Sequence, residues 1–133
     1  MKVVLDANVL ISSFFWGGNP RIVVERIIAG KDEFFVTKEI LEEIKDVLGR
    51  EKFHADKDAV HFFINSIEEI GNMIIPKKRI TDGSRYKSDN KYLECGIAAL
   101  VDFIVSGDTH LLELKEYGTI KIVSVKKYLE MVQ

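Results

Sequence analysis

Lys2-Val3-Val4-Leu5-Asp6-Ala7-Asn8 is the stretch that decides the fold, because an apolar run stops on a carboxylate and turns directly into a helical pattern. Phe103-Ile104-Val105-Ser106-Gly107-Asp108 repeats this arrangement near the other end of the chain. Continuous apolar strands are typical of buried parallel sheets. In open α/β sheets, ligands bind beyond the carboxyl ends of the strands. If the two strands are neighbours, Asp6 and Asp108 face one pocket, and we expect that pocket to hold a divalent metal.

Strand-like and helical patterns alternate along the rest of the chain. Short apolar runs indicate three further strands, at residues 33–37, 72–75 and 120–123. Apolar side chains at helical spacing indicate the longer helices, at residues 38–49, 58–70 and 89–101. This alternation predicts a three-layer α/β/α sandwich with a parallel sheet of roughly five strands.

The composition is that of a single globular domain spanning residues 1–133, with 47% hydrophobic residues to build its core. A net charge of -2, from 19 basic and 21 acidic residues, gives no bulk attraction for nucleic acid, so binding would use local patches. Cys95 is the only cysteine and cannot form an internal disulfide. With no secretory leader and no apolar run of about 20 residues, we expect no membrane span and a cytoplasmic location.

Three aspartates at element boundaries are candidates for the site, and each also has a purely structural interpretation. An aspartate directly before a helix is a good N-cap, worth about 1 kcal/mol, and both Asp6 and Asp108 stand at such positions. Asp89 at a helix start favours the macrodipole, although its register aligns it with the apolar stripe through Leu93 and Ile97. Both interpretations stay open for all three residues.

Glu43 is the acid of the 38–49 helix that can reach inward. At about 100° per residue, the apolar face centres between Ile40 and Ile44, and Glu43 lies at its margin. A solvated helix edge is the alternative for Glu43. The other acids of this helix point away from the apolar face: Glu39, Glu42 and Asp46.

These four carboxylates form a donor set made only of oxygen: Asp6, Glu43, Asp89 and Asp108. Such a set suits Mg²⁺ or Mn²⁺, whereas a structural zinc site would use Cys and His. Mg²⁺ usually keeps several waters and combines one or two carboxylates with phosphate oxygens of a substrate. The sequence therefore predicts phosphate chemistry that needs no nucleophilic side chain.

In these segments the chain resembles the PIN-domain family, most of all its VapC-like toxins from prokaryotic toxin–antitoxin pairs. The matching segments are residues 3–10, 39–48, 89–96 and 102–108. The resemblance implies a PIN fold, a metal-dependent endoribonuclease acting on RNA, a cognate antitoxin and a homodimer. It further implies that Asp6, Glu43, Asp89 and Asp108 are catalytic acids that bind the metal, with Asn8 as a supporting polar group.

Two positions depart from the family pattern. Ser88 stands where relatives often carry a further acid, and Thr109 stands where a lysine is common. The number of bound metals and the turnover therefore stay open.

The connection that leads to Asp89 is rich in positive charge. Its basic residues are candidates for contacts to an RNA backbone, which position a nucleic acid without reading its sequence; a solvated loop is the alternative. They are Lys77, Lys78, Arg79, Arg85 and Lys87. Arg50 and Lys52 form a second, weaker basic group.

Two other functions compete with the nuclease. A haloacid-dehalogenase-like phosphatase has a similar layout, but Asn8 cannot supply the acid required at its position, and no lysine motif is placed for it. A catalytically silent PIN module that binds RNA or a protein partner is the other alternative, because Ser88 replaces an acid.

Overall fold

The computed structural model describes residues 1–50 and 56–133. The strands of this part of the chain are β1 (Lys2–Leu5), β2 (Glu33–Val36), β3 (Gly71–Met73), β4 (Phe103–Val105), β5 (Glu116–Tyr117) and β6 (Ile120–Val123). The helices are α1 (Ala7–Phe15), α2 (Gly18–Ile28), α3 (Lys38–Leu48), α4 (Lys57–Ile70), α5 (Asn90–Ala99), α6 (Thr109–Leu112) and α7 (Val125–Val132), and a 3₁₀ turn, η2 (Lys87–Asp89), precedes α5.

The strands form one sheet in the order β3-β2-β1-β4-β6-β5. All pairs are parallel except β5 with β6, which is antiparallel. β1 and β4 lie at the centre in register, with Leu5 opposite Val105. Because parallel strands end at the same edge, the residues that follow Leu5 and Val105 lie side by side.

Local sequence accounts for the elements that surround this edge. The three residues Val3, Val4 and Leu5 have no exposed surface, as expected for a central strand covered on both faces. Thr37 caps α3 by accepting a hydrogen bond from the Ile40 amide at 3.2 Å. One face of α3 is buried while the opposite face is exposed, so its amphipathic pattern fixes its orientation.

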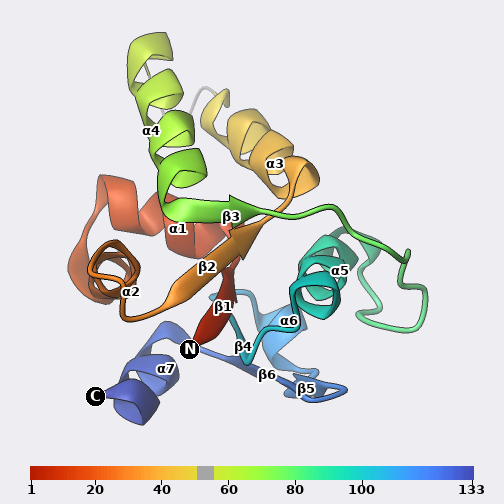
Figure 1. Cartoon of the computed structure of the whole chain (residues 1–133). Helices are drawn as coiled ribbons and strands as arrows, with labels where there is room; N and C mark the ends of the chain where they lie inside the picture. The colour runs from red at the N-terminus through yellow and green to blue at the C-terminus, as the bar shows by residue number, and fades with distance from the viewer. Residues whose placement is uncertain (51–55) are drawn as a thin grey trace.

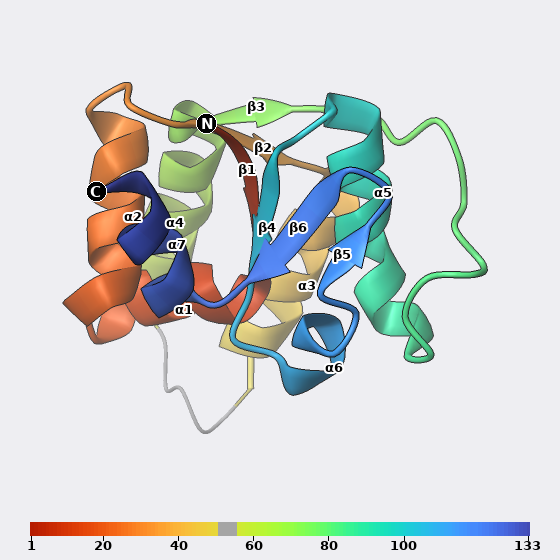
Figure 2. The same cartoon turned by 90° about the horizontal axis from the view of Figure 1, so that it is seen from below.

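Helices cover both faces of the sheet, as the two perpendicular views show (Figures 1 and 2). α2 and α7 contact each other on one face, whereas α5 packs against β1, β2 and β4 from the other. α3 contacts α1, α4 and α5 near the carboxyl edge of the strands. The three-layer α/β/α architecture expected from the sequence is confirmed.

The sheet differs from the expected one in two details. It has six strands within the described residues, because Glu116–Tyr117 adds a two-residue antiparallel strand too short to give a sequence pattern. The strand expected at 72–75 is shifted and ends at Met73, although the Ile74 amide still donates to the Val36 carbonyl at 3.0 Å. Among the described residues, no helix combines the length and the apolar character needed to cross a membrane.

Candidate metal centre

Asp6 is buried at the point where β1 passes into α1. Its Oδ1 accepts from the Val9 amide at 2.8 Å, which makes it the N-cap of α1. Its Oδ2 accepts from the Ser106 hydroxyl at 2.5 Å and from the Gly107 amide at 3.1 Å. The capping interpretation of Asp6 is therefore correct, and the same carboxylate also lies at the carboxyl edge of the sheet.

Asp108 lies three residues beyond the end of β4, whereas Ser106 is the residue next to Asp6 in the sheet register. Its Oδ1 accepts from the His110 amide at 2.9 Å and so caps α6, as the capping interpretation expects. Its own amide donates to the Ser106 hydroxyl at 2.9 Å. Ser106 thereby links both aspartates, because its hydroxyl donates to Asp6 and accepts from Asp108.

Asp89 ends the η2 turn and has only 7% of its surface exposed. The Ser84 hydroxyl donates to its Oδ2 at 3.4 Å. The neighbouring Asn90 holds the preceding loop, since its side chain accepts from the Ser84 amide at 2.9 Å and donates to the Ile80 carbonyl at 3.2 Å. These bonds order a loop that has no periodic sequence pattern, and they direct Asp89 inward.

Glu43 lies on α3 with 30% of its side chain exposed, in agreement with a marginal position. Its Oε2 accepts from the Lys91 ammonium at 2.9 Å, and its Oε1 accepts a short hydrogen bond from the Tyr92 hydroxyl. That hydroxyl also accepts from the Ala7 amide at 3.1 Å, and Lys91 donates to the Ser88 carbonyl at 2.5 Å. The sequence did not predict these partners, because α3 and α5 are far apart along the chain.

The aspartates repel one another electrostatically. Burial raises the pKa of Asp6, and the charge of Asp108 adds to the rise, although the bonds from Ser106, Val9 and Gly107 oppose it. Burial also raises the pKa of Asp89, followed by the charge of Asp108. The hydrogen bonds to Asp6 and Asp89, and the charge of His110 near Asp89, do not outweigh burial and the charge of Asp108.

One cavity of about 180 Å³ joins these groups at the carboxyl ends of β1 and β4. The structure thus brings the four acids and Asn8 together around a single space, and Ala7, Val47, Arg50 and Tyr92 complete the lining. Within residues 1–50 and 56–133, however, no three His, Cys, Asp or Glu side chains converge closely enough to coordinate one ion as they stand. Hydrogen bonds hold Asp6, Glu43 and Asp108 to their own neighbours, which accounts for the separation.

A family model described as PIN domain matches residues 2–110. The chain belongs to the PIN domain family. This match favours the PIN fold over the phosphatase layout considered from the sequence. None of the curated proteins matches the chain.

Two solved structures share the fold of this PIN domain at low sequence identity. VapBC2 from Rickettsia felis, crystallised with a DNA fragment from its promoter, has 10% identity and a TM-score of 0.65, over 93% of this chain and 98% of that chain. PAE2754 from Pyrobaculum aerophilum has 12% identity and a TM-score of 0.67, over 99% of this chain and 89% of that chain.

The residues around the cavity of this PIN domain fit a hard divalent cation. Their donors are carboxylate oxygens, and hard cations such as Mg²⁺ and Mn²⁺ prefer such ligands. The pKa values of Asp6 and Asp89 are raised first by burial and then in part by the charge of Asp108, so a bound cation would offset this repulsion. Mg²⁺ usually keeps several waters, so only some of these carboxylates need to contact an ion directly.

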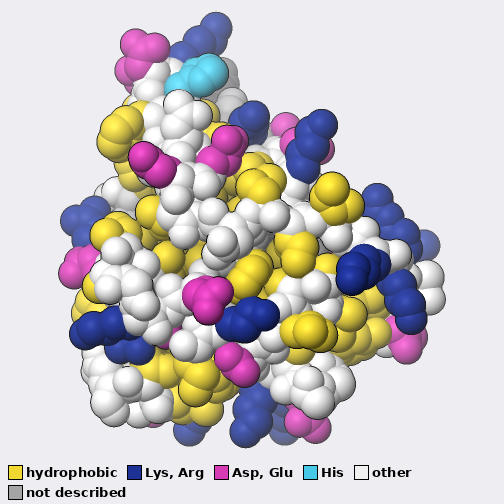
Figure 3. All heavy atoms as spheres, viewed as in Figure 1, with side chains coloured by type: hydrophobic (Ala, Val, Ile, Leu, Met, Phe, Trp, Pro, Cys, Tyr) yellow, Lys and Arg dark blue, Asp and Glu magenta, His cyan; other side chains and the backbone are white. Residues whose placement is uncertain are grey.

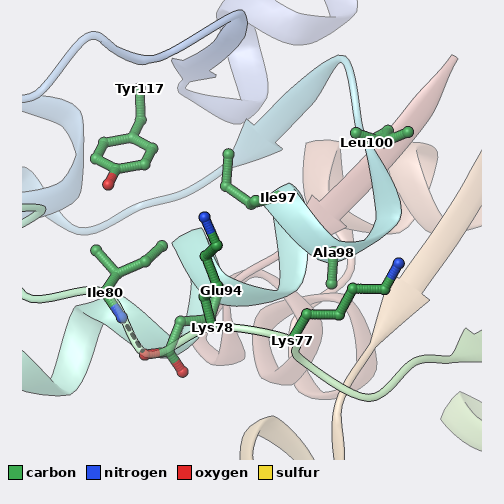
Figure 4. A pocket seen from close by; sticks show the side chains of 8 residues that line it. All are labelled: Lys77, Lys78, Ile80, Glu94, Ile97, Ala98, Leu100 and Tyr117. Carbon is green, nitrogen blue, oxygen red and sulfur yellow. Dashed lines mark hydrogen bonds between the residues drawn. The ribbon is translucent and has the colours of Figure 1, made fainter.

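The basic residues predicted to contact RNA lie over the connection between β3 and α5, where Figure 3 shows Lys and Arg side chains gathered at one edge. They do not line the acidic cavity. Lys77 and Lys78 line a separate pocket of about 340 Å³ beside α5, with Ile97, Leu100 and Tyr117 (Figure 4).

Two of the other basic residues of this connection are already paired with carboxylates, so an RNA phosphate would have to compete for them. Arg79 is paired with Glu39 at 3.1 Å and Glu94 at 3.3 Å, and Arg85 is paired with Glu113 at 3.3 Å. Lys87 is exposed in η2, two residues before the cavity-lining Asp89. Of the second basic group, Arg50 lines the cavity and Lys52 lies outside the described residues.

Proposed function

We propose that this PIN domain is a metal-dependent endoribonuclease that hydrolyses RNA phosphodiester bonds. The observation that carries the proposal is the single cavity lined by Asp6, Glu43, Asp89 and Asp108 at the carboxyl edge of the sheet. PIN domains as a family are hydrolytic nucleases, which supports the same reaction. We further propose that residues 1–133 act as one domain.

The acids have distinct tasks in this proposal. Asp6, Asp89 and Asp108 face a common space and would hold Mg²⁺ or Mn²⁺, with Glu43 at its side. When bound, such an ion polarises the phosphoryl group and lowers the pKa of a bound water. Asn8 is exposed at the rim of the cavity, where its amide can orient a phosphate or a water.

Basic side chains would position the RNA. Arg50 lines the cavity and is the nearest guanidinium to the acids among the described lining residues. Lys77, Lys78, Arg79, Arg85 and Lys87 lie on the adjacent connection. We propose that they contact the backbone beyond the cleaved bond, which would require Arg79 and Arg85 to exchange their carboxylate partners for phosphates.

We also propose a toxin role with a cognate antitoxin. The support is the shared fold with VapBC2 from Rickettsia felis, which was crystallised bound to promoter DNA. In the same proposal the protein works in the cytoplasm as a homodimer. Co-expression with the product of an adjacent small gene, followed by copurification, tests the antitoxin, and light scattering tests the dimer.

The nuclease is tested with a fluorescently labelled, unstructured RNA and the purified protein, in Mn²⁺, in Mg²⁺ and in excess chelator. We expect cleavage with either metal, no cleavage with chelator, and a loss of at least about 100-fold in Asp108→Asn, because that change removes a charge facing the metal. Asp46→Asn is the matched control, since Asp46 is exposed on α3 and does not line the cavity.

Cleavage that persists in Asp108→Asn or in chelator would show that a contaminant or another site does the chemistry. Binding of Mn²⁺ and RNA without any cleavage would instead identify a silent PIN module, the alternative that Ser88 suggests.

A further inference from the structure

Glu43 differs from the three aspartates because one of its hydrogen-bond donors is a cation. Lys91 donates to Oε2 at 2.9 Å, and Tyr92 donates to Oε1. The Lys91 side chain is only 10% exposed, so this ion pair is largely shielded from solvent. The Glu43 carboxylate is therefore already neutralised by a cation of the protein itself.

The two donors come from one turn of α5 and are themselves held in place. The Lys91 ammonium also donates to the Ser88 carbonyl at 2.5 Å, and the Tyr92 hydroxyl accepts from the Ala7 amide at 3.1 Å. The arrangement is therefore built into the contact between α3 and α5.

The aspartates have the opposite surroundings. Asp6 and Asp89 each feel the charge of Asp108, and their hydrogen-bond donors are hydroxyls and backbone amides, which carry no formal charge. Three aspartates and the cavity-lining Arg50 leave a formal charge of minus two, which one divalent ion neutralises. A second divalent ion would compete with the Lys91 ammonium for Glu43.

We propose that Lys91 is a built-in cation that takes the place of a second metal, so that the site binds one divalent ion between the three aspartates. Glu43, which lines the cavity, is then a positioning residue that holds the Lys91 ammonium at 2.9 Å rather than a metal ligand. This inference rests on the proposed metal-dependent function. The inference adds the number of bound ions, which is one, and the residue that limits that number, which is Lys91.

The experiment is calorimetric titration of Mn²⁺ into the full chain, with the electron paramagnetic resonance spectrum of the bound ion as a second readout. Wild type is expected to bind one Mn²⁺ per chain with the spectrum of an isolated ion. Lys91→Met frees Glu43 and is expected to bind two, with an exchange-coupled spectrum. Lys91→Arg keeps the charge and is expected to bind one.

Variants of Glu43 distinguish a Lys91 that replaces a second ion from a Lys91 that only joins α3 to α5. Glu43→Gln is expected to bind one Mn²⁺ with an affinity within about threefold of wild type, whereas Asp108→Asn loses at least about 30-fold. The double variant Lys91→Met/Glu43→Gln is expected to return to one ion, because the second site needs the Glu43 carboxylate. Thermal unfolding of each variant verifies that it is folded.

The outcomes distinguish this inference from the proposed function. Wild type that binds no Mn²⁺ overturns both. Wild type that binds two ions, or Lys91→Met that still binds one, overturns the role of Lys91 and leaves the metal-dependent nuclease intact. If Lys91→Met does not fold, Glu43→Gln decides alone, since loss of Mn²⁺ binding there would identify Glu43 as a ligand.

Discussion

Asp6 follows β1 and Asp32 precedes β2, so these two carboxylates with little exposed surface lie at opposite edges of the sheet, yet their pKa values move in opposite directions. Asp6 is 3% exposed and Asp32 is 4% exposed. Burial raises the pKa of Asp6, and Asp108 adds to the rise. Burial acts in the same sense on Asp32, but the side chains of Arg26 and Tyr128 and the N-terminal ammonium outweigh it and lower the pKa.

Both the depth of burial and the partners differ between the two carboxylates, although their exposed surface is nearly the same. Arg26 Nε donates to Asp32 Oδ2 at 2.8 Å, whereas the donors to Asp6 are the Ser106 hydroxyl and backbone amides. Arg26 neutralises Asp32, whereas Asp6 feels the negative charge of Asp108. Asp32 therefore stabilises the fold, while Asp6 belongs to a region that stores uncompensated charge for a ligand.

The largest expected effect separates these regions by activity. Asp6→Asn should lower the rate of RNA cleavage by at least about 100-fold, because it removes a charge from the proposed metal site. Its free energy of unfolding should change by about 1 kcal/mol or less, because Asn is also a good N-cap and the relief of repulsion offsets the hydrogen bond that the Gly107 amide loses. Rates per folded molecule, measured with the RNA assay, check this. Equal losses in Asp6→Asn and Asp32→Asn would remove the functional distinction.

The second effect is on stability. Asp32→Asn should lower the free energy of unfolding by about 2 kcal/mol, less than for a fully buried pair, because Arg26 is 17% exposed. Urea denaturation measures this loss. Arg26→Leu in the same background should cost little more, since the ion pair is already broken. A urea midpoint of Asp32→Asn equal to that of wild type would show that Asp32 does not stabilise the fold.

The third effect is a pH dependence of opposite sign in the two regions. The folded pKa of Asp32 lies below the ordinary 3.8, so its contribution is present above pH 3.8 and is lost as pH falls toward the folded pKa. The folded pKa of Asp6 lies above 3.8, so its contribution is lost as pH rises from 3.8 through the folded pKa.

Urea denaturation in chelator, repeated from acidic to neutral pH, measures the free energy of unfolding over both pH ranges. In Asp32→Asn, the free energy of unfolding should depend less on pH below 3.8 and be unaltered in its pH dependence above it. In Asp6→Asn, it should depend less on pH above 3.8. Identical profiles for the two variants would show that their surroundings do not differ in the folded state.

The smallest effect is a stabilisation. Asp89→Asn removes the repulsion between Asp89 and Asp108 and should raise the melting temperature in chelator by about 3 °C. Added Mn²⁺ should raise the wild-type melting temperature and abolish the advantage of the variant. Differential scanning fluorimetry with and without metal measures this, and a lower melting temperature for Asp89→Asn in chelator would argue against stored repulsion.

Much of the fold followed from patterns that are local in the chain. The apolar runs at β1 and β4, the helical spacing in α3 and the aspartates that end the strands are all visible without tertiary information. The two-residue strand β5 was not predicted, because its pairing with β6 leaves no periodic trace in the sequence.

The surroundings of the candidate site were less accessible. Spacing placed Glu43 at the margin of α3, but its partners Lys91 and Tyr92 come from α5. The basic connection suggested RNA contacts near the acids, whereas Lys77 and Lys78 line another pocket and Arg79 is paired. Charge counted along a sequence does not reveal which carboxylates will neutralise it.

The sequence by itself determined the alternation of strands and helices, the residues that cap them and the type of donor available to a metal, because these depend on near neighbours. Only the tertiary structure decided which charges meet. Ser106 reaches Asp6 across 100 positions, and Lys91 reaches Glu43 across 48. Sheet order and helix packing bring such groups together, and the resulting balance of burial and partners sets the charge that each carboxylate carries.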